Sequence, residues 1–277
     1  MASYVTTKHS PLFPILMIVI LLITLFPIYW IVVTSLKTPV ENILPVPTLY
    51  PHKFTLDNYQ KVLLGGSLRN LFNSIFVTAV STLLSLAIGF LAAYALVRYK
   101  FPLKFNVVFL VWIIIVKMLP PVVLAVPLYE MFSKMHLINN LWGLVVVFQV
   151  YTLPYCIWML FGFLKTLPLE YEEAADIDGA SRLQIVRLVV FPLVQTGVVA
   201  TAIFSIIVAW DEFLFSMLFI RSPELQTLPL AIVGYIGEFE TLWGQLMAIS
   251  VLAIIPIIIF VRFVYREMAS AYSLGLK

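Results

Sequence analysis

The sequence predicts an all-α membrane protein with six transmembrane helices. Hydrophobic residues make up 62% of its 277 positions and charged residues only 11%, whereas a soluble domain is roughly half apolar and a quarter charged. Apolar stretches of about 20 residues, the length an α-helix needs to cross the hydrocarbon core, recur between short polar segments. Six stretches are therefore candidate spans: residues 12–33, 71–96, 105–126, 141–164, 194–220 and 242–265.

The spans form one domain, residues 12–265, between short tails at 1–11 and 266–277. The first apolar run is too long for the core of a signal peptide, and no small-residue cleavage pattern follows it, so we interpret it as a retained span. Placing both termini in the cytoplasm puts the majority of the 17 Lys and Arg residues in cytoplasmic segments. The positive-inside rule favours this multi-pass orientation.

Several function classes do not fit the composition. The net charge of +3 is scattered, without the basic run or face that holds nucleic acid, so we expect no nucleic-acid partner. Cys156 is the single cysteine, which excludes an internal disulfide and a cysteine-based metal cage. His9, His52 and His136 are scattered as well. We predict no catalytic or metal-binding residues, and an intramembrane enzyme is disfavoured.

Proline stands within or beside most of the spans, where each residue removes a backbone donor and tends to kink its helix. Kinked spans suit a translocation path, but membrane helices also tolerate proline without such a role. The prolines concerned are Pro14, Pro27, Pro120, Pro121, Pro154 and Pro256.

The longest cytoplasmic connection, residues 165–192, predicts a helix, a turn and a second helix. Pro168 suits a first helical turn, and the glutamates that follow complement the positive end of the helix dipole. Gly179 can adopt the left-handed conformation that ends a helix, and Ser181 with Gln184 forms a capping box for the next one. The acidic residues of the first helix are Glu170, Glu172 and Glu173.

Small and apolar residues interrupt these glutamates, so one face of the first helix is suited to docking another protein. An ordinary solvated amphipathic helix would show the same pattern. The residues of this face are Tyr171, Ala174, Ala175 and Ile177.

The sequence Glu173-Ala174-Ala175, with Gly179 and Pro192 at fixed spacing after it, resembles the signature loop of ABC-importer membrane subunits. Val189 and Phe191 depart from the isoleucine and leucine common there, as apolar exchanges. The resemblance implies a type I ABC importer permease fold in a bacterial or archaeal cytoplasmic membrane, with cytoplasmic coupling helices that seat in an ATPase subunit. The coupling residues it implies are Glu172, Glu173, Ala174, Ala175, Asp178 and Gly179.

Shorter motifs along the rest of the chain resemble carbohydrate importers of the maltose-permease type, and the short first outer loop and the total length resemble the smaller of the two permease subunits in such systems. They lie at residues 54–59, 73–74, 92–98, 101–102, 119–121, 127–129, 137–140 and 209–213. Two departures occur, at Gln195-Thr196-Gly197, where Pro-Gly is usual, and at Asp211, where asparagine is common.

This resemblance implies three protein partners: an ATPase dimer, a second homologous permease, and an extracytoplasmic solute-binding protein that contacts segments 40–59 and 221–240. The sequence carries no Gly-rich phosphate loop of the Walker type, so we expect no ATPase site and no cofactor in this chain. ATP and magnesium would be bound by the ATPase partner.

Three charged residues fall inside apolar stretches: Lys117, Asp211 and Glu212. A charge at the bilayer centre costs about 2.5–3.5 kcal/mol on insertion scales, which something must offset. Together with Trp158 and Trp210, these residues are candidates for a substrate path that binds sugar hydroxyls and rings. The alternative is structural, with a carboxylate pairing with Lys117 or capping a broken helix.

The predicted function is that of a permease subunit in a binding-protein-dependent ABC importer for a carbohydrate or polyol, using ATP hydrolysed by a separate subunit. An ABC importer for a non-carbohydrate solute would share the coupling loop. A proton-coupled secondary transporter would use the buried carboxylates as a relay and need no ATPase. The loop at 165–192 argues against that second alternative.

Overall fold

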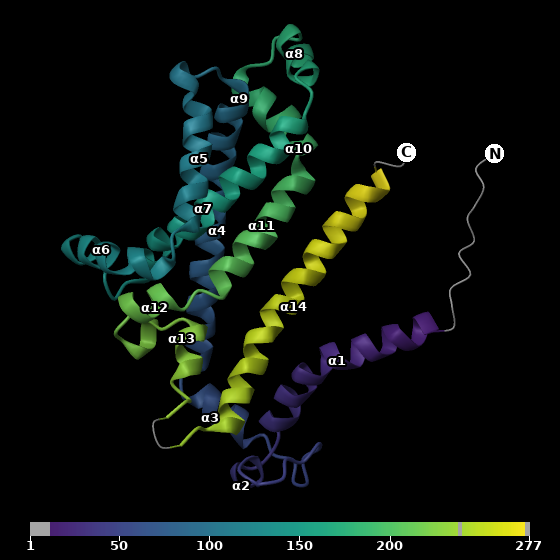
Figure 1. The fold of residues 1–277 in the computed structure, drawn as a ribbon, viewed down its shortest axis with the longest axis vertical. Helices are drawn as coiled ribbons and strands as arrows, with labels where there is room; N and C mark the ends of the chain where they lie inside the picture. Colours follow the sequence, from purple (N-terminus) through teal and green to yellow (C-terminus); the bar gives the residue numbers. More distant parts are fainter. Residues whose placement is uncertain (1–11, 238–239, 275–277) are drawn as a thin grey trace. The chain divides into compact units, whose positions relative to one another are not determined.

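The computed structural model describes residues 12–237 and 240–274. Its described part is helical apart from the connections, among them residues 43–56, and an isolated β-bridge between Ile236 and Thr241 (Figure 1). The chain divides into two compact units. The first comprises Met1–Gly65 with Gly234–Ile254, and the second Gly66–Val233 with Ile255–Lys277. The predicted tail at 1–11 lies outside the described residues.

The first unit contains the N-terminal span and the segment that follows it. Its helices are α1 (Leu12–Ser35), α2 (Pro39–Asn42), α3 (Asp57–Leu64) and the beginning of α14 (Trp243–Leu274). Helix α1 has a mean hydropathy of 2.8 over its best window, and none of that window is buried. Such a helix requires lipid or a partner around it.

The connection after α1 is fastened to the end of that helix by the motif at residues 54–59. The Asn58 side-chain amide donates to the carbonyl oxygens of Ser35 at 2.9 Å and Lys37 at 2.8 Å. The Tyr59 hydroxyl lies 2.7 Å from that of Ser35. A Cβ added at Gly244 would lie 2.5 Å from the Asn58 amide nitrogen, so only glycine fits there. The motif therefore has a structural role.

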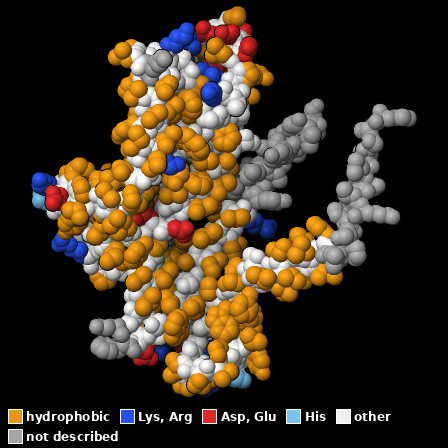
Figure 2. Space-filling view, in the orientation of Figure 1, with side chains coloured by type: hydrophobic (Ala, Val, Ile, Leu, Met, Phe, Trp, Pro, Cys, Tyr) orange, Lys and Arg blue, Asp and Glu red, His pale blue; other side chains and the backbone are white. Residues whose placement is uncertain are grey.

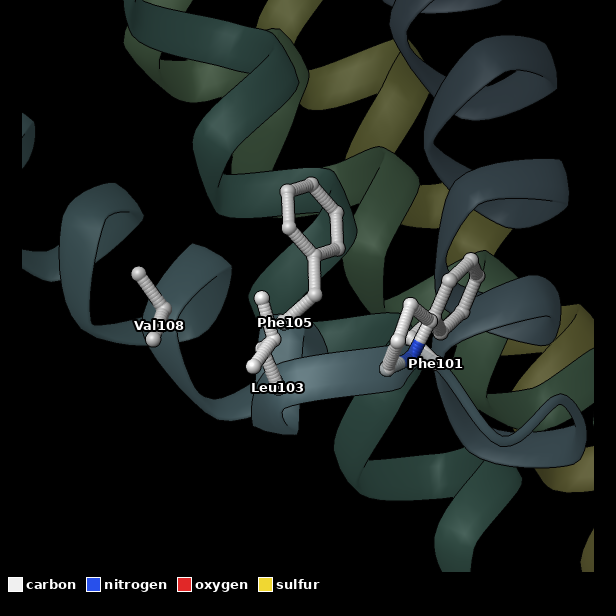
Figure 3. Close-up of a pocket in the computed structure, with 5 residues that line it drawn as sticks. Phe101, Leu103, Phe105 and Val108 are labelled. Carbon is white, nitrogen blue, oxygen red and sulfur yellow. The ribbon is translucent and has the colours of Figure 1, made fainter.

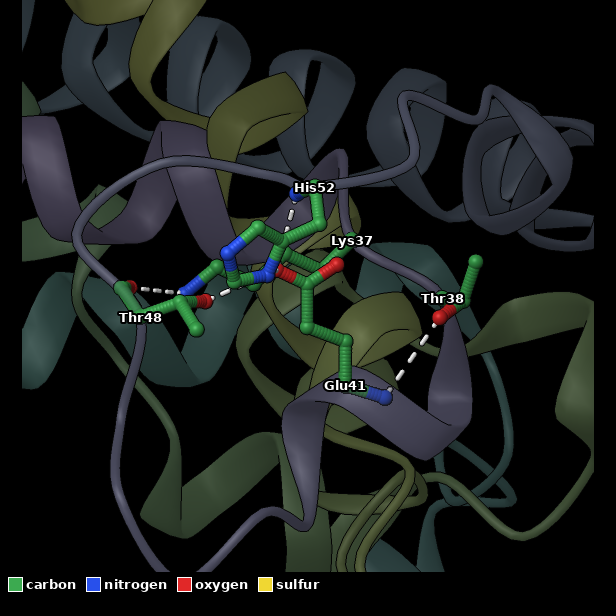
Figure 4. A network of polar contacts seen from close by, with 5 residues as sticks. All are labelled: Lys37, Thr38, Glu41, Thr48 and His52. Atoms are coloured by element: carbon green, nitrogen blue, oxygen red, sulfur yellow. Dashed lines mark hydrogen bonds and ion pairs between the residues drawn. The ribbon is translucent and has the colours of Figure 1, made fainter.

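A polar network closes the same connection (Figure 4). The Glu41 carboxylate is nearly buried and accepts hydrogen bonds from the Thr48 hydroxyl at 2.8 Å and the His52 backbone N–H at 3.0 Å. The His52 backbone N–H is the main reason that the pKa of Glu41 is lowered. Lys37 donates to the Thr48 carbonyl oxygen, and burial lowers the pKa of its ammonium.

The second unit is built around the long helices α4, α7 and α11. Its elements are α4 (Ser67–Arg98), α5 (Phe105–Met118), α6 (Pro121–Lys134), α7 (Leu141–Thr166), α8 (Glu170–Ile177), α9 (Arg182–Gln184), a π-helical turn (Ile185–Val190), α10 (Phe191–Leu193), α11 (Gln195–Trp210), α12 (Leu214–Phe219), α13 (Leu228–Val233) and the remainder of α14.

Small and polar side chains fill the contact between α4 and α7. The Ser85 hydroxyl lies 2.6 Å from the Gln149 side-chain oxygen and 2.5 Å from the Thr152 hydroxyl. A Cβ added at Gly89 would lie 2.8 Å from the Cβ of Cys156. Close approach through small residues, with hydrogen bonds across the contact, is how membrane helices associate without a hydrophobic driving force.

The turn between α4 and α5 holds a leucine in an uncommon conformation. Leu103 has a φ of 54° and is 96% exposed. It lines an apolar hollow of about 460 Å³ with Phe101, Pro102, Phe105 and Val108 (Figure 3). A positive φ suits glycine, and a branched side chain adopts it at a cost.

The described helices support the predicted all-α membrane fold with up to six spans. Four unbroken helices are long and apolar enough to span: Phe13–Ser35, Ser67–Arg98, Leu141–Thr166 and Trp243–Arg262. Two helix pairs qualify only as bent spans: Phe105–Met118 with Pro121–Lys134, at 99°, and Arg182–Leu193 with Gln195–Trp210, at 76°.

The predicted span 105–126 therefore crosses a break, which coincides with the pair Pro120 and Pro121. The predicted span 194–220 crosses another, because α11 ends at Trp210 and α12 begins at Leu214. By contrast, Pro27, Pro154 and Pro256 lie inside continuous helices. Helix α14 also continues to Leu274, through most of the predicted tail 266–277.

Candidate functional site

The predicted helix and turn at the start of loop 165–192 are present. Helix α8 begins at Glu170, two residues after Pro168, and ends at Ile177, with Asp178 as its C-cap. Gly179 has a φ of 82°. Its N–H donates to the Asp176 carbonyl and the Ala180 N–H to the Ala175 carbonyl, both at 3.0 Å. This pair of bonds is a Schellman motif, which ends the helix where the glycine predicted it.

The predicted second helix is present but composite. Ser181 and Gln184 form the capping box: the Ser181 N–H donates to the Gln184 side-chain oxygen at 2.8 Å, and the Gln184 N–H to the Ser181 hydroxyl at 3.4 Å. Only α9 follows before the chain adopts the π-helical turn Ile185–Val190. The chain then bends by 76° into α11.

The outer side of the loop exposes apolar and acidic side chains together, as Figure 2 shows at the α8 end. Ile177 is 86% exposed and Leu183 is 75% exposed. Uncovered apolar side chains of this size, rimmed by charge, are typical of a docking surface. Of the coupling residues that the resemblance implies, Glu173, Ala174, Asp178 and Gly179 are exposed, and Ala175 is half-buried.

Glu172 differs from these residues because the structure places it on the inner side of α8. Only 3% of it is exposed. Its carboxylate accepts hydrogen bonds from the Tyr94 hydroxyl at 2.7 Å and from the Arg98 side chain at 2.5 Å. Arg98 also donates to the Leu167 carbonyl oxygen at 3.0 Å. The side chain of Glu172 is therefore not on the exposed face that carries Glu173 and the other exposed coupling residues.

The substrate-path candidates do not converge on one site. The Lys117 ammonium lies 3.0 Å from the ring centroid of Tyr155 and 5.3 Å from that of Trp158. This arrangement is a cation–π contact, which offsets part of the cost of the charge. The partner of Lys117 is therefore aromatic rather than Asp211 or Glu212.

Glu212 caps a helix, as the structural alternative anticipated. Its carboxylate is 8% exposed and accepts the backbone N–H groups of Phe215 at 2.8 Å and Ser216 at 3.2 Å. The Ser216 hydroxyl adds a third donor at 3.3 Å. These donors belong to the first turn of α12, where backbone N–H groups have no partner within the helix.

Asp211 and Trp210 line a hollow of about 720 Å³ in the second unit. Its other lining residues are apolar except Thr78, and they come from α4, α11 and α14. The candidate path residues thus fall into three places: Lys117 with Trp158, Trp210 with Asp211, and Glu212 alone.

Two asparagines with no role assigned from sequence fasten the chain at the end of α4 opposite α8. The side-chain amide of Asn73 donates to the carbonyl oxygens of Glu224 at 2.9 Å and Gln226 at 3.0 Å. Beside it, the Ser74 hydroxyl accepts the Leu228 N–H at 2.6 Å. Segment 224–228 is therefore held on α4.

Asn139 holds the residues just before that segment. Its side-chain oxygen accepts the N–H groups of Arg221 at 3.0 Å and Ser222 at 2.9 Å, and its amide donates to the Ser222 hydroxyl at 2.8 Å. Asn139 itself has a φ of 56°, a conformation that asparagine tolerates better than most residues. The motifs at 73–74 and 137–140 were the sequence signals that marked both sites.

A multi-pass helical membrane protein with bent spans and an exposed helix–turn–helix between two spans has the architecture of a transport permease. The chain belongs to the family of binding-protein-dependent transport system inner membrane components, whose model matches residues 85–272. The predicted family is confirmed, and the protein is a multi-pass component of an inner membrane.

Curated relatives match most of the chain. The sulfoquinovosyl glycerol transport system permease protein SmoH of Agrobacterium fabrum is 40% identical over 255 residues, covering 91% of this chain and 89% of SmoH. The trehalose/maltose transport system permease protein MalG of Thermococcus litoralis is 32% identical over 262 residues, covering 93% of each. The diacetylchitobiose uptake system permease protein DasC of Streptomyces coelicolor is 31% identical, covering 90% of each.

Solved structures share the fold. A chain of a bacterial ABC transporter involved in the import of the acidic polysaccharide alginate matches with a TM-score of 0.77 at 22% identity, covering 96% of this chain and 99% of that chain. A chain of the MetNI methionine ABC transporter in an inward-facing conformation matches with a TM-score of 0.59 at 18% identity, covering 76% and 97%. The predicted ABC importer permease fold is confirmed.

Proposed function

We propose that this chain is the permease subunit through which a carbohydrate or related polyol crosses the cytoplasmic membrane, driven by ATP that a separate subunit hydrolyses. The exposed helix–turn–helix at 165–192 carries the proposal, because it offers a shaped docking surface between two spans. The carbohydrate assignment is supported by relatives named for trehalose/maltose, diacetylchitobiose and sulfoquinovosyl glycerol transport.

In this proposal both termini and loop 165–192 face the cytoplasm, where the ATPase dimer binds the exposed side of α8. Glu173 pairs with a basic residue of the ATPase, Ala174 permits close approach, and Gly179 shapes the turn. Asp178 and Ala175 complete the surface. ATP and magnesium are bound by the ATPase subunits. Glu172 lies on the inner side of α8 and holds the loop on α4 through its hydrogen bonds with Arg98 and Tyr94.

A second homologous permease completes the translocation path, since Trp158 and Asp211 are both exposed on the described surface of this chain. Trp158 is 50% exposed, so its ring can stack on a sugar while Lys117 donates to hydroxyl groups. Trp210 and Asp211 lie at the 720 Å³ hollow. The solute-binding protein docks on the opposite side, at segments 40–59 and 221–240.

The test is ATPase activity of the reconstituted complex, with and without loaded binding protein, for the wild type, Gly179→Asp and Glu173→Lys. We expect both variants to lose the hydrolysis stimulated by the binding protein, because Asp at φ 82° is strained and a lysine reverses the charge at the contact. Transport that persists without any ATPase would instead identify a secondary carrier.

Solute class is tested in the same vesicles by uptake of labelled disaccharides, polyols and amino acids. Uptake of the amino acids alone would overturn the carbohydrate assignment and leave the ABC importer assignment intact.

A further inference from the structure

Helix α4 differs from the other unbroken spans because it contains no proline. It runs for 32 residues from Ser67 to Arg98, a length of about 48 Å. The other three unbroken spans each contain a proline: Pro27 in α1, Pro154 in α7 and Pro256 in α14. A helix without proline keeps every backbone N–H donor and lacks a common cause of sharp kinks, so α4 is suited to move as one piece.

One end of α4 holds the loop that carries the docking surface. Tyr94 and Arg98 both donate to the buried carboxylate of Glu172 on α8, at 2.7 and 2.5 Å. Arg98 also holds the Leu167 carbonyl, just before α8 begins. Around these bonds, Ala175 and Ala180 pack against an apolar cluster that includes Phe90, Tyr94, Leu160, Leu164, Ile185 and Val190. A displacement of α8 is therefore passed to α4.

The other end of α4 holds a segment on the opposite side of the unit. Asn73 donates to the carbonyls of Glu224 and Gln226, and Ser74 accepts from the Leu228 N–H. Asn73 and Arg98 are 25 residues apart in one helix, or about 37 Å along its axis. That distance exceeds the hydrocarbon core of about 30 Å, so a membrane-spanning α4 is long enough to hold the two sets of bonds at opposite surfaces of the bilayer.

We propose that α4 is the rod that couples the ATPase-docking helix α8 to segment 224–228, with Glu172 and Asn73 as the positioning residues at its two ends. This inference rests on the proposed function, which places the ATPase at α8 and the binding protein near 221–240. Binding-protein docking moves segment 224–228, α4 follows, and α8 repositions the ATPase. Because coupling between two sites is reciprocal, ATP-driven movement of α8 reaches segment 224–228 by the same route.

Charge and burial explain why Glu172 suits this role better than its neighbours. A nearly buried carboxylate bonded to a guanidinium and a phenol is fixed in position, whereas the exposed Glu170 and Glu173 are free to follow a partner. Charge-assisted hydrogen bonds are also directional, so α8 cannot rotate on α4 without breaking them.

The experiment measures complex yield, basal ATPase activity, and its stimulation by loaded binding protein for Glu172→Gln, Tyr94→Phe and Asn73→Ala. We expect normal yield and basal hydrolysis in Tyr94→Phe and Asn73→Ala, and stimulation in every variant is expressed relative to that variant's own basal hydrolysis. Stimulation should fall by about fivefold or more in Glu172→Gln and Asn73→Ala, the range typical of a lost coupling between sites. It should fall less in Tyr94→Phe, which removes a single hydrogen bond.

Matched controls are Glu170→Gln, the same change at an exposed position of α8, and Phe72→Ala, beside Asn73 on α4 and 68% exposed. Both should keep wild-type stimulation. The exchange of Glu172→Arg with Arg98→Glu should recover part of the stimulation that either single change removes, which is the signature of a direct pair.

If Glu172→Gln and Asn73→Ala keep wild-type stimulation while Gly179→Asp abolishes it, the proposed coupling through α4 is wrong and the proposed function stands. If Glu172→Gln loses yield while Tyr94→Phe and the exchanged pair keep full stimulation, the contact of Glu172 with Arg98 and Tyr94 serves folding alone. That result would also overturn the inference. A wild-type complex that shows no stimulation at all would overturn the proposed function first.

Discussion

The spans α4 and α7 stay continuous, whereas the apolar runs at 105–126 and 194–220 both break, and the two breaks are made by different chemistry. At Pro120 and Pro121 the chain lacks two backbone donors, and the axis turns by 99°. At residues 211–213 no proline is present, and the Glu212 carboxylate accepts the first free N–H groups of α12 instead. A helix in lipid can therefore be interrupted by removing donors or by supplying an acceptor.

The largest effect is expected from removing the acceptor. Glu212→Leu leaves the N–H groups of Phe215 and Ser216 without a partner in a buried site, which should lower the free energy of unfolding by about 2–3 kcal/mol. Glu212→Gln, which keeps one oxygen, should lower it less. Thermal unfolding in detergent measures both, with the exposed neighbour Asp211→Asn as the control. Equal stability of Glu212→Leu and wild type would mean that the carboxylate does not make this break.

The packing of the continuous helices α4 and α7 depends on the volume of the side chains between them rather than on charge. Gly89→Ala places a methyl group 2.8 Å from the Cβ of Cys156, so α4 and α7 must separate. We expect a loss of about 1–3 kcal/mol in unfolding free energy, the range for overpacking. Gly162→Ala, on α7 with nothing within 4 Å, is the matched control and should be neutral or slightly stabilising. A neutral Gly89→Ala would show that the contact is looser than described.

The turn between α4 and α5 should be stabilised by a glycine in place of Leu103. Leu103→Gly relieves a φ of 54° and removes an exposed apolar side chain. Relief of the left-handed strain, less the entropy that glycine adds to the unfolded chain, should raise the unfolding free energy by up to about 1 kcal/mol. Leu103→Ala keeps the positive φ with a Cβ and should not produce the same gain. Identical shifts in both variants would assign the effect to the side chain.

The buried carboxylate of Glu41, outside the spans, provides the smallest expected effect and a pH readout. The pKa of Glu41 is lowered from its ordinary value of 4.5, so its ionised form stabilises the folded state. That contribution is fully present above pH 4.5 and is lost as the pH falls through the lowered folded pKa. Unfolding curves measured downward from pH 5 should show this loss in the wild type and a flatter profile in Glu41→Gln. Parallel profiles would exclude the Glu41 network as the cause.

The parts predicted from sequence are those set by local chemistry. Gly179, Ser181 and Gln184 act within a few residues of themselves, so the turn and the capping box at 165–192 follow from their order in the chain. The same holds for the apolar stretches, because span length is fixed by the bilayer. The break at Pro120 and Pro121 was also visible as a proline pair, although the predicted span ran through it.

The parts that could not be predicted depend on partners distant in sequence. Glu172 meets Arg98 across 74 residues, and Asn73 meets Gln226 across 153. No local pattern distinguishes Glu172 from Glu173, and only the placement of α4 against α8 separates their roles. Likewise, the sequence shows Glu212 only as a charge within an apolar stretch, and its role as acceptor for the first turn of α12 depends on the break in the helix. Lys117 and Trp158 were predicted as members of one larger group, of which the structure brings these two within 5.3 Å, and Tyr155, which is nearer to the ammonium, was missed.

The Asn139 clamp also bears on how the protein is made. Its partners Arg221 and Ser222 follow it by 82 and 83 residues, and ribosomes add about 5–20 residues per second, so Asn139 leaves the ribosome about 4–17 seconds before them. During that interval the left-handed turn before α7 must be held by local hydrogen bonds alone. One of them is donated by the Trp142 N–H to the side-chain oxygen of Asn140 at 2.9 Å. The contacts of Asn139 with Arg221 and Ser222 can therefore form only after α12 has been synthesised, onto a turn that is already in place.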